Sequence, residues 1–80
     1  MKIKYYGQIN YTVDSEHPDI KYMSDWKEDK VYTFSDVYVF DYPCEIEEVT
    51  NYIVHDLKLV AGGGYNSHHI HNLTFDIHQV

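Results

Sequence analysis

An amphipathic segment between Tyr42 and Gly64 most constrains how this chain can fold. Its apolar side chains recur at steps of three and four residues, which places them on one stripe of an α-helix. The stripe consists of Ile46, Val49, Ile53, Leu57 and Val60. Pro43 suits the first helical turn, and Gly62 can close the last one. A helix with one apolar stripe needs a sheet to cover, so the segment predicts a two-layer α+β domain.

Two segments alternate between apolar and polar side chains, as half-buried strands do. Residues 2–14 alternate strictly, and Gly7 in their middle is expected to mark a bend or a bulge. Residues 69–80 form the last expected strand. Its inward-facing side chains are expected to be His71, Leu73, Phe75 and Ile77.

A third segment, residues 31–42, is apolar on both faces of the strand that it predicts. Val31, Thr33, Val37 and Val39 share one side, and the other side carries Tyr32, Phe34, Tyr38, Phe40 and Tyr42. The Ser35-Asp36 pair leaves two readings open. It could hold a bulge that switches faces, or a tight turn that divides the segment into two shorter strands.

The element order is strand, strand, helix, strand within one domain spanning residues 1–80. If the first strand lies between the other two, it pairs antiparallel with both. This gives a mainly antiparallel three-stranded sheet of order 2-1-3, covered by one helix. Residues 14–30 are expected to form a charged loop with at most one helical turn, anchored by Trp26. Trp26 would be either a lid over one end of the core or an exposed interface anchor.

Charge and composition exclude several partners. The chain carries 13 acidic residues against 6 lysines, a net charge of −7, which opposes direct contact with nucleic acid and with anionic membranes. The apolar runs are too short to span a membrane, and the N-terminus lacks the apolar region of a signal peptide. Cys44 is the single cysteine. Together these features predict a cytoplasmic protein in a reducing compartment.

The histidines are the strongest chemical candidates: His68, His69, His71 and His78. His69 and His71 share a face at strand spacing, so both could reach one Zn²⁺, with a third ligand from His17, His55 or Cys44. Their register points toward the core, however, and no paired-cysteine or H-E-x-x-H motif accompanies them. We therefore predict neither a metal site nor a cofactor, and no catalytic residue. A small His- or metal-dependent enzyme is the alternative.

Small size, acid excess, absence of arginine and 9 tyrosines are features in which the chain resembles small acidic phage-encoded inhibitors of bacterial defence. These are proteins of the anti-CRISPR and DNA-mimic type. The resemblance implies a non-enzymatic protein that binds and blocks a basic site on a host protein, such as a nuclease or a CRISPR effector. It carries over no specific residue.

One helix covers one face of a sheet, so the open face is expected to expose tyrosines to a protein partner. Acids of the 14–30 loop would steer a basic protein toward it. The predicted partner-binding residues are Tyr6, Tyr38, Asp14, Glu16, Asp19, Asp25, Glu28 and Asp29. The alternative is a structural subunit that covers the same face by forming a homodimer.

Overall fold

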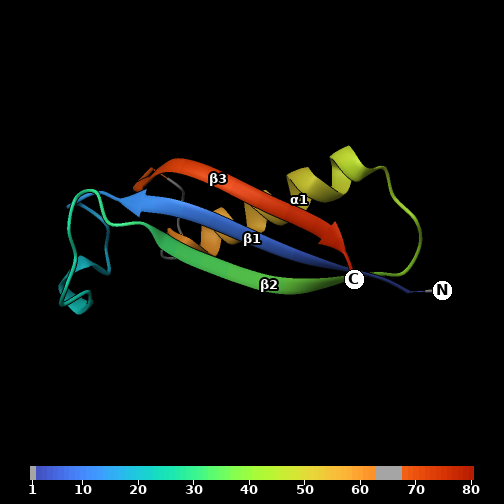
Figure 1. Cartoon of the computed structure of the whole chain (residues 1–80), viewed down its shortest axis with the longest axis horizontal. Helices are drawn as coiled ribbons and strands as arrows, with labels where there is room; N and C mark the ends of the chain where they lie inside the picture. Colours follow the sequence, from blue (N-terminus) through green and yellow to red (C-terminus); the bar gives the residue numbers. More distant parts are fainter. Residues whose placement is uncertain (1, 63–67) are drawn as a thin grey trace.

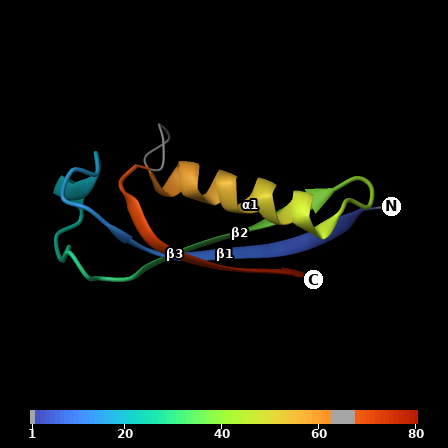
Figure 2. The ribbon, with the colours of Figure 1, turned by 90° about the horizontal axis from the view of Figure 1, so that it is seen from above.

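The computed structural model describes residues 2–62 and 68–80. The elements, in chain order, are β1 (Ile3–Val13), the single 3-10 turn η1 (Ile20–Tyr22), β2 (Tyr32–Phe40), α1 (Ile46–Ala61) and β3 (Ile70–Gln79). The strands form one antiparallel sheet of order β2-β1-β3, and α1 lies across one of its faces (Figures 1 and 2). The predicted two-layer α+β architecture and the strand order 2-1-3 are confirmed.

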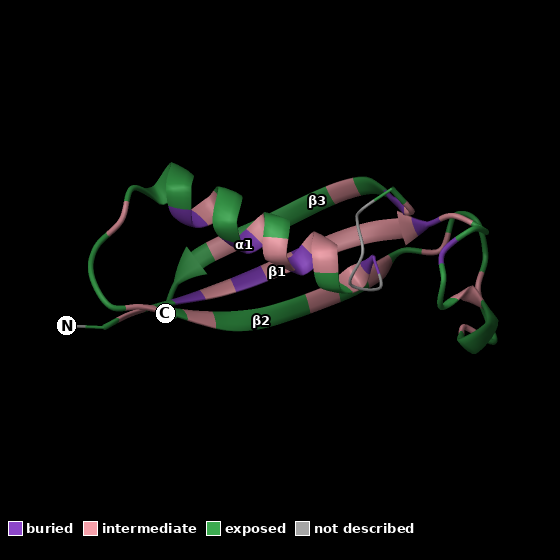
Figure 3. Ribbon diagram, turned by 180° about the vertical axis from the view of Figure 1, so that it is seen from behind, coloured by how far each residue is buried: buried purple, intermediate pink, exposed green. Residues whose placement is uncertain are grey.

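The core lies between β1 and the middle of α1. Val49, Ile53 and Leu57 are each at most 1% exposed, and they pack with Tyr5 and Ile9 of β1. Figure 3 shows these buried positions along β1 and the inner side of the helix. The stripe is shorter than the sequence pattern predicts, because its end members are exposed: Ile46 by 59% and Val60 by 53%. Pro43 and Cys44 precede α1 and are not in its first turn.

Gly7 lies in the buried middle of β1, where the pairing with both neighbouring strands is regular. The bend or bulge expected there is absent from β1. A Cβ atom at Gly7 would instead overlap the Cγ2 methyl of Ile53 and lie 3.3 Å from Cδ1 of Ile77. Glycine is therefore required here because α1 approaches the backbone of β1 too closely for any side chain.

β2 is one continuous strand. Its register with β1 runs unbroken from the Ile3–Phe40 pair to the Tyr11–Tyr32 pair, so the Ser35-Asp36 segment holds neither a bulge nor a turn. On the face that α1 covers, the residues of β2 that pair with the core positions of β1 are Tyr32, Phe34, Asp36, Tyr38 and Phe40. The other face is open, and its Val37 and Val39 are 49% and 52% exposed.

The sheet does contain a bulge, in β3. Asn10 pairs with Thr74 but Thr12 pairs with His71, so Tyr11 faces two residues of β3. One of them, Asn72, has φ of 54°, in the left-handed region that asparagine tolerates better than most residues. One extra residue inverts the alternation beyond it.

The bulge decides where the histidines of β3 point. Leu73 and Ile77 pack against the core as expected, while Phe75 is 53% exposed. At the start of β3, before the bulge, Ile70 is the buried residue, and it pairs with the buried Val13. His71 therefore lies beside Thr12 on the open face. The expectation that His71 faces inward was wrong, because it extended the alternation of residues 73–79 through Asn72.

Candidate functional site

The connection between β1 and β2 extends past the sheet, at the end of the molecule away from both termini (Figure 1). It contains one helical turn, η1, as expected. Trp26 is partly buried, and its Nε1–H donates to the carbonyl oxygen of Val13 at 2.9 Å. Trp26 thus fastens the connection to the last residue of β1, and its side chain is partly buried rather than exposed.

His17 is the second fastening point of this connection, and it is only 2% exposed. The backbone N–H of Asp19 donates to Nδ1 at 3.0 Å, so Nε2–H is the donor to the carbonyl oxygen of Ala61 at 2.7 Å. Ala61 ends α1, where carbonyl groups lack partners within the helix. The sequence suggested His17 only as a metal ligand. No local pattern could have revealed a partner 44 positions away.

Asp14 joins two histidines at the same end of the sheet. Its Oδ2 lies 2.8 Å from Nε2 of His71, and its Oδ1 lies 3.0 Å from Nδ1 of His69. Oδ1 also accepts the backbone N–H of Glu16 at 2.9 Å. The hydrogen bond from His71 is the main reason that the pKa of Asp14 lies below its ordinary value, and partial burial opposes it. The β3 bulge produces this cluster by turning His71 outward.

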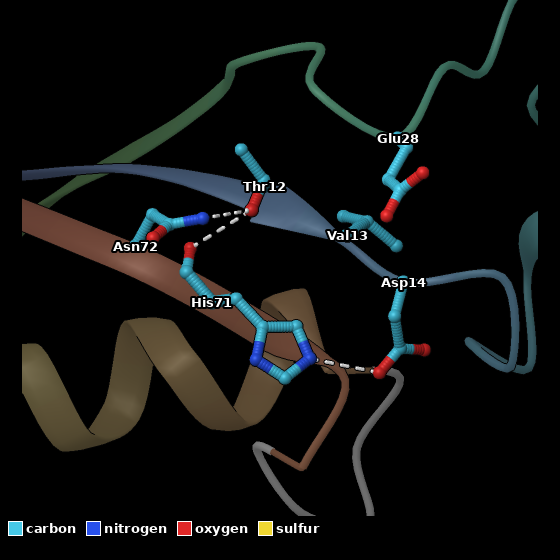
Figure 4. Close-up of a pocket in the computed structure, with 6 residues that line it drawn as sticks. All are labelled: Thr12, Val13, Asp14, Glu28, His71 and Asn72. Atoms are coloured by element: carbon cyan, nitrogen blue, oxygen red, sulfur yellow. Dashed lines mark hydrogen bonds and ion pairs between the residues drawn. The ribbon is translucent and has the colours of Figure 1, made fainter.

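A pocket of about 240 Å³ adjoins the cluster. It is lined by Thr12, Val13, Asp14, Glu28, His71 and Asn72, and Figure 4 shows the His71 ring directed at Asp14. The Thr12 hydroxyl donates to the carbonyl oxygen of His71 at 3.3 Å and accepts from Asn72 Nδ2 at 2.9 Å. Thr12 is therefore not hydrogen-bonded to an imidazole, as an activated hydroxyl nucleophile would be. The pocket offers carboxylates and an imidazole to a polar or cationic group.

The histidines do not converge on a metal position. His78 lies toward the far end of β3, with its ring 5.2 Å from that of Tyr6, while His69 and His71 both direct a ring nitrogen at Asp14. His55 belongs to α1, and Cys44 precedes it. Within residues 2–62 and 68–80, no group of three or more His, Cys, Asp or Glu side chains is arranged to hold a metal ion.

The acids predicted to bind a partner differ in how they are paired. Asp14 is held by the two histidines. Asp25 accepts a hydrogen bond from Lys30 Nζ at 2.8 Å, which lowers the pKa of Asp25 and raises that of Lys30. The remaining four are exposed and form no ion pair with any described residue: Glu16, Asp19, Glu28 and Asp29. These four are called the free acids below.

The two tyrosines predicted to bind a partner lie on opposite faces of the sheet. Tyr6 pairs with Val37 on the open face. Tyr38 pairs with Tyr5 on the helix side, where its hydroxyl donates to Asp56 at 2.6 Å. Burial, and then this hydrogen bond, raise the pKa of Tyr38. The expectation that Tyr38 shares an exposed surface with Tyr6 was wrong.

The open face is mostly polar. The Tyr6 hydroxyl donates to Gln8 Oε1 at 2.8 Å, and Gln8 Nε2 donates to Asn10 Oδ1 at 3.4 Å. Thr33 completes the row by donating to Asn10 Oδ1 at 2.8 Å. The connection that carries the free acids begins at Asp14, directly after β1. Asp14 is eight residues from Tyr6, roughly 26 Å at the rise of an extended strand. Tyr6 and the free acids therefore form separate surfaces.

No protein-family model matches this chain, and no curated protein or solved structure matches it. In the described part of the chain, no helix has the length and apolar character needed to cross a bilayer.

Proposed function

We propose that this chain is a non-enzymatic interaction protein that binds and blocks a protein with a basic surface. The contact is made by the free acids of the connection between β1 and β2. The observation that carries this proposal is that the connection extends past the sheet and yet is fastened to it. Trp26 bonds to the end of β1, and His17 bonds to the end of α1.

A fastened segment favours binding because little conformational freedom is lost when the partner arrives. Four carboxylates without ion pairs attract cationic groups over a distance of about one Debye length, roughly 8–10 Å at physiological salt. Such attraction raises the rate of encounter with a basic protein. Asp25 contributes less, because Lys30 already neutralises it.

The proposed biological role is that of a phage-type inhibitor in the cytoplasm of a bacterial host. The partner class is a host defence protein whose basic surface normally contacts nucleic acid, such as a nuclease or a CRISPR effector. The net charge of −7 supports binding to the protein and disfavours direct binding to nucleic acid.

Affinity capture from a bacterial lysate tests this function. The tagged wild-type chain should retain a basic protein, and the Glu28→Lys/Asp29→Lys variant should retain much less of it. The control is Asp36→Lys/Asp76→Lys, which makes the same change of charge at exposed positions of β2 and β3. Equal losses of the captured protein for both variants would show that only net charge matters. The connection that carries the free acids, called the acidic segment below, would then have no specific role.

A homodimer is the second candidate, favoured by the exposed Val37 and Val39 on the open face. It predicts a dimer in light scattering that Val37→Lys converts to a monomer. A monomeric wild-type chain at high micromolar concentration would eliminate this candidate.

A further inference from the structure

A second pocket lies where β2 ends and α1 begins. Figure 2 shows that this end of the molecule is opposite the connection between β1 and β2, which carries the free acids. The volume of the pocket is about 180 Å³. The lining residues are Phe40, Cys44, Glu48, Val49 and Tyr52. The pocket therefore combines two aromatic rings and one carboxylate with a thiol and one aliphatic side chain.

The aromatic walls are held in place by their neighbours. The ring of Tyr52 packs edge-to-face on Phe40 at 5.8 Å and on Tyr38 at 6.1 Å. Phe40 packs in the same manner on Tyr5 at 5.7 Å, and the Tyr38 hydroxyl is bonded to Asp56. Tyr52 is nevertheless 58% exposed. A rigid, exposed ring loses little entropy when a ligand binds to it, so it suits recognition better than it suits the core.

The carboxylate gives the pocket its charge preference. Among the described residues, no lysine or histidine forms an ion pair with Glu48. Glu47, in the same first turn of α1, and the preceding Glu45 add to the negative potential. The ion pair between Lys2 and Asp41, at 3.5 Å, involves no lining residue of the pocket. The pocket is thus an aromatic site with an unpaired negative charge.

We propose that this pocket binds an arginine side chain. A guanidinium group is planar, so it can lie against an aromatic ring while its N–H groups donate to a carboxylate. Phe40 or Tyr52 supplies the ring, and Glu48 supplies the acceptor. That the arginine belongs to the basic protein partner rests on the function proposed above, whereas guanidinium binding itself does not.

The two contact regions set a requirement on that partner. The molecule is 43 Å long and 20 Å wide. The connection from β1 to β2, which carries the free acids, and the connection from β2 to α1, next to the pocket, lie toward opposite ends of the long axis (Figure 1). A partner that occupies both must present cationic groups over a comparable length. Simultaneous engagement would raise the affinity above that of either contact alone.

An NMR titration with a short capped peptide tests the pocket without the partner. The probe is acetyl-Gly-Arg-Gly-amide, and its control replaces arginine by citrulline, which has the same shape without the charge. The arginine peptide should shift the backbone amide signals of Val49 and Tyr52 in a saturable way, and the citrulline peptide should bind more weakly by a similar factor to that given next for Glu48→Gln. Glu48→Gln should weaken the arginine peptide about two- to fivefold, as expected for an exposed ion pair.

Glu47→Gln is the matched control, since it removes the same charge from the same helical turn but does not line the pocket. It should weaken the arginine peptide less than Glu48→Gln does, because Glu47 adds only to the surrounding potential. Equal shifts with both peptides, equal effects of both variants, or no saturable shift would each overturn the proposal. If the arginine peptide does not bind while Glu28→Lys/Asp29→Lys still weakens capture of the partner, the proposed arginine site is refuted and the proposed function is not. If the peptide binds but the acidic segment proves neutral in capture, the pocket stands and the proposed function falls.

Discussion

The imidazole of His17 donates from Nε2 to the carbonyl oxygen of Ala61 at 2.7 Å, and so joins the connection between β1 and β2 to the last residue of α1. The two residues are 44 positions apart. This bond, the Trp26–Val13 bond and the contacts of Asp14 with His69 and His71 hold the connection that carries the free acids against the end of the sheet. The surface proposed to bind a partner is therefore held to the helix and the sheet and is not an independent tail.

His17→Ala should lower the free energy of unfolding by about 1–3 kcal/mol, because it removes a buried hydrogen bond and leaves the Ala61 carbonyl without that donor. Urea denaturation measures the loss. His55→Ala, at an exposed position of α1, is the control and should change stability by less than about 0.5 kcal/mol. Equal effects of the two substitutions would show that the bond to Ala61 does not stabilise the fold.

Ile53→Ala and Leu57→Ala should each cost about 2–5 kcal/mol, since both side chains are fully buried between helix and sheet. Chemical denaturation again gives the values. Val60→Ala removes an apolar side chain from the same helix at a site that is 53% exposed, and it should cost far less. If the midpoint for Ile53→Ala moved no further than that for Val60→Ala, the packing of α1 on β1 would be refuted.

Gly7→Ala should destabilise the protein by about 1–3 kcal/mol, because the added methyl group overlaps Cγ2 of Ile53. Leucine has no methyl at this branch, so the cost of Gly7→Ala should be smaller in an Ile53→Leu background. A double-mutant cycle measures that difference as a coupling energy. Additive effects of the two substitutions would mean that something other than the approach of Ile53 requires glycine.

Asp14 should contribute to the pH dependence of stability. Its pKa is lower in the folded chain than in the unfolded chain, chiefly because of the His71 hydrogen bond. Its contribution is therefore present above the unfolded value of about 3.9 and is lost as the pH falls through the folded value. Asp14→Asn should be less stable than wild type at about pH 5, and the difference should shrink below about pH 4. A difference independent of pH would contradict the Asp14–His71 interaction.

The repeated features of the sequence predicted the layers and the strand order. The strict alternation of residues 2–14 marked the central strand, and the stripe through Val49, Ile53 and Leu57 marked the face of the helix that is buried. The alternation and the stripe each repeat over several residues, so one residue that departs from the pattern does not hide it. Gly7 was visible as an irregularity, but its cause lies in Ile53, a residue of another element.

The candidate site depended on features that do not repeat. The left-handed Asn72 inverts the side-chain alternation of β3, and nothing in the sequence from Ile70 to Thr74 shows where one extra residue is inserted. That single bulge brings His71, the second of the two histidines, to Asp14. The burial of Tyr38 was equally hidden, because both faces of β2 are apolar and only the position of α1 selects one of them.

The association rate of the captured partner, measured as a function of salt concentration, tests most directly whether the free acids bind a basic protein. Surface plasmon resonance with wild type and Glu28→Lys/Asp29→Lys gives this rate at several ionic strengths. We expect the variant to associate at least about threefold more slowly at low salt, with a flatter salt dependence, because steering charges have been reversed. An unchanged rate and an unchanged salt dependence, in a variant shown to be folded, would contradict binding through the acidic segment.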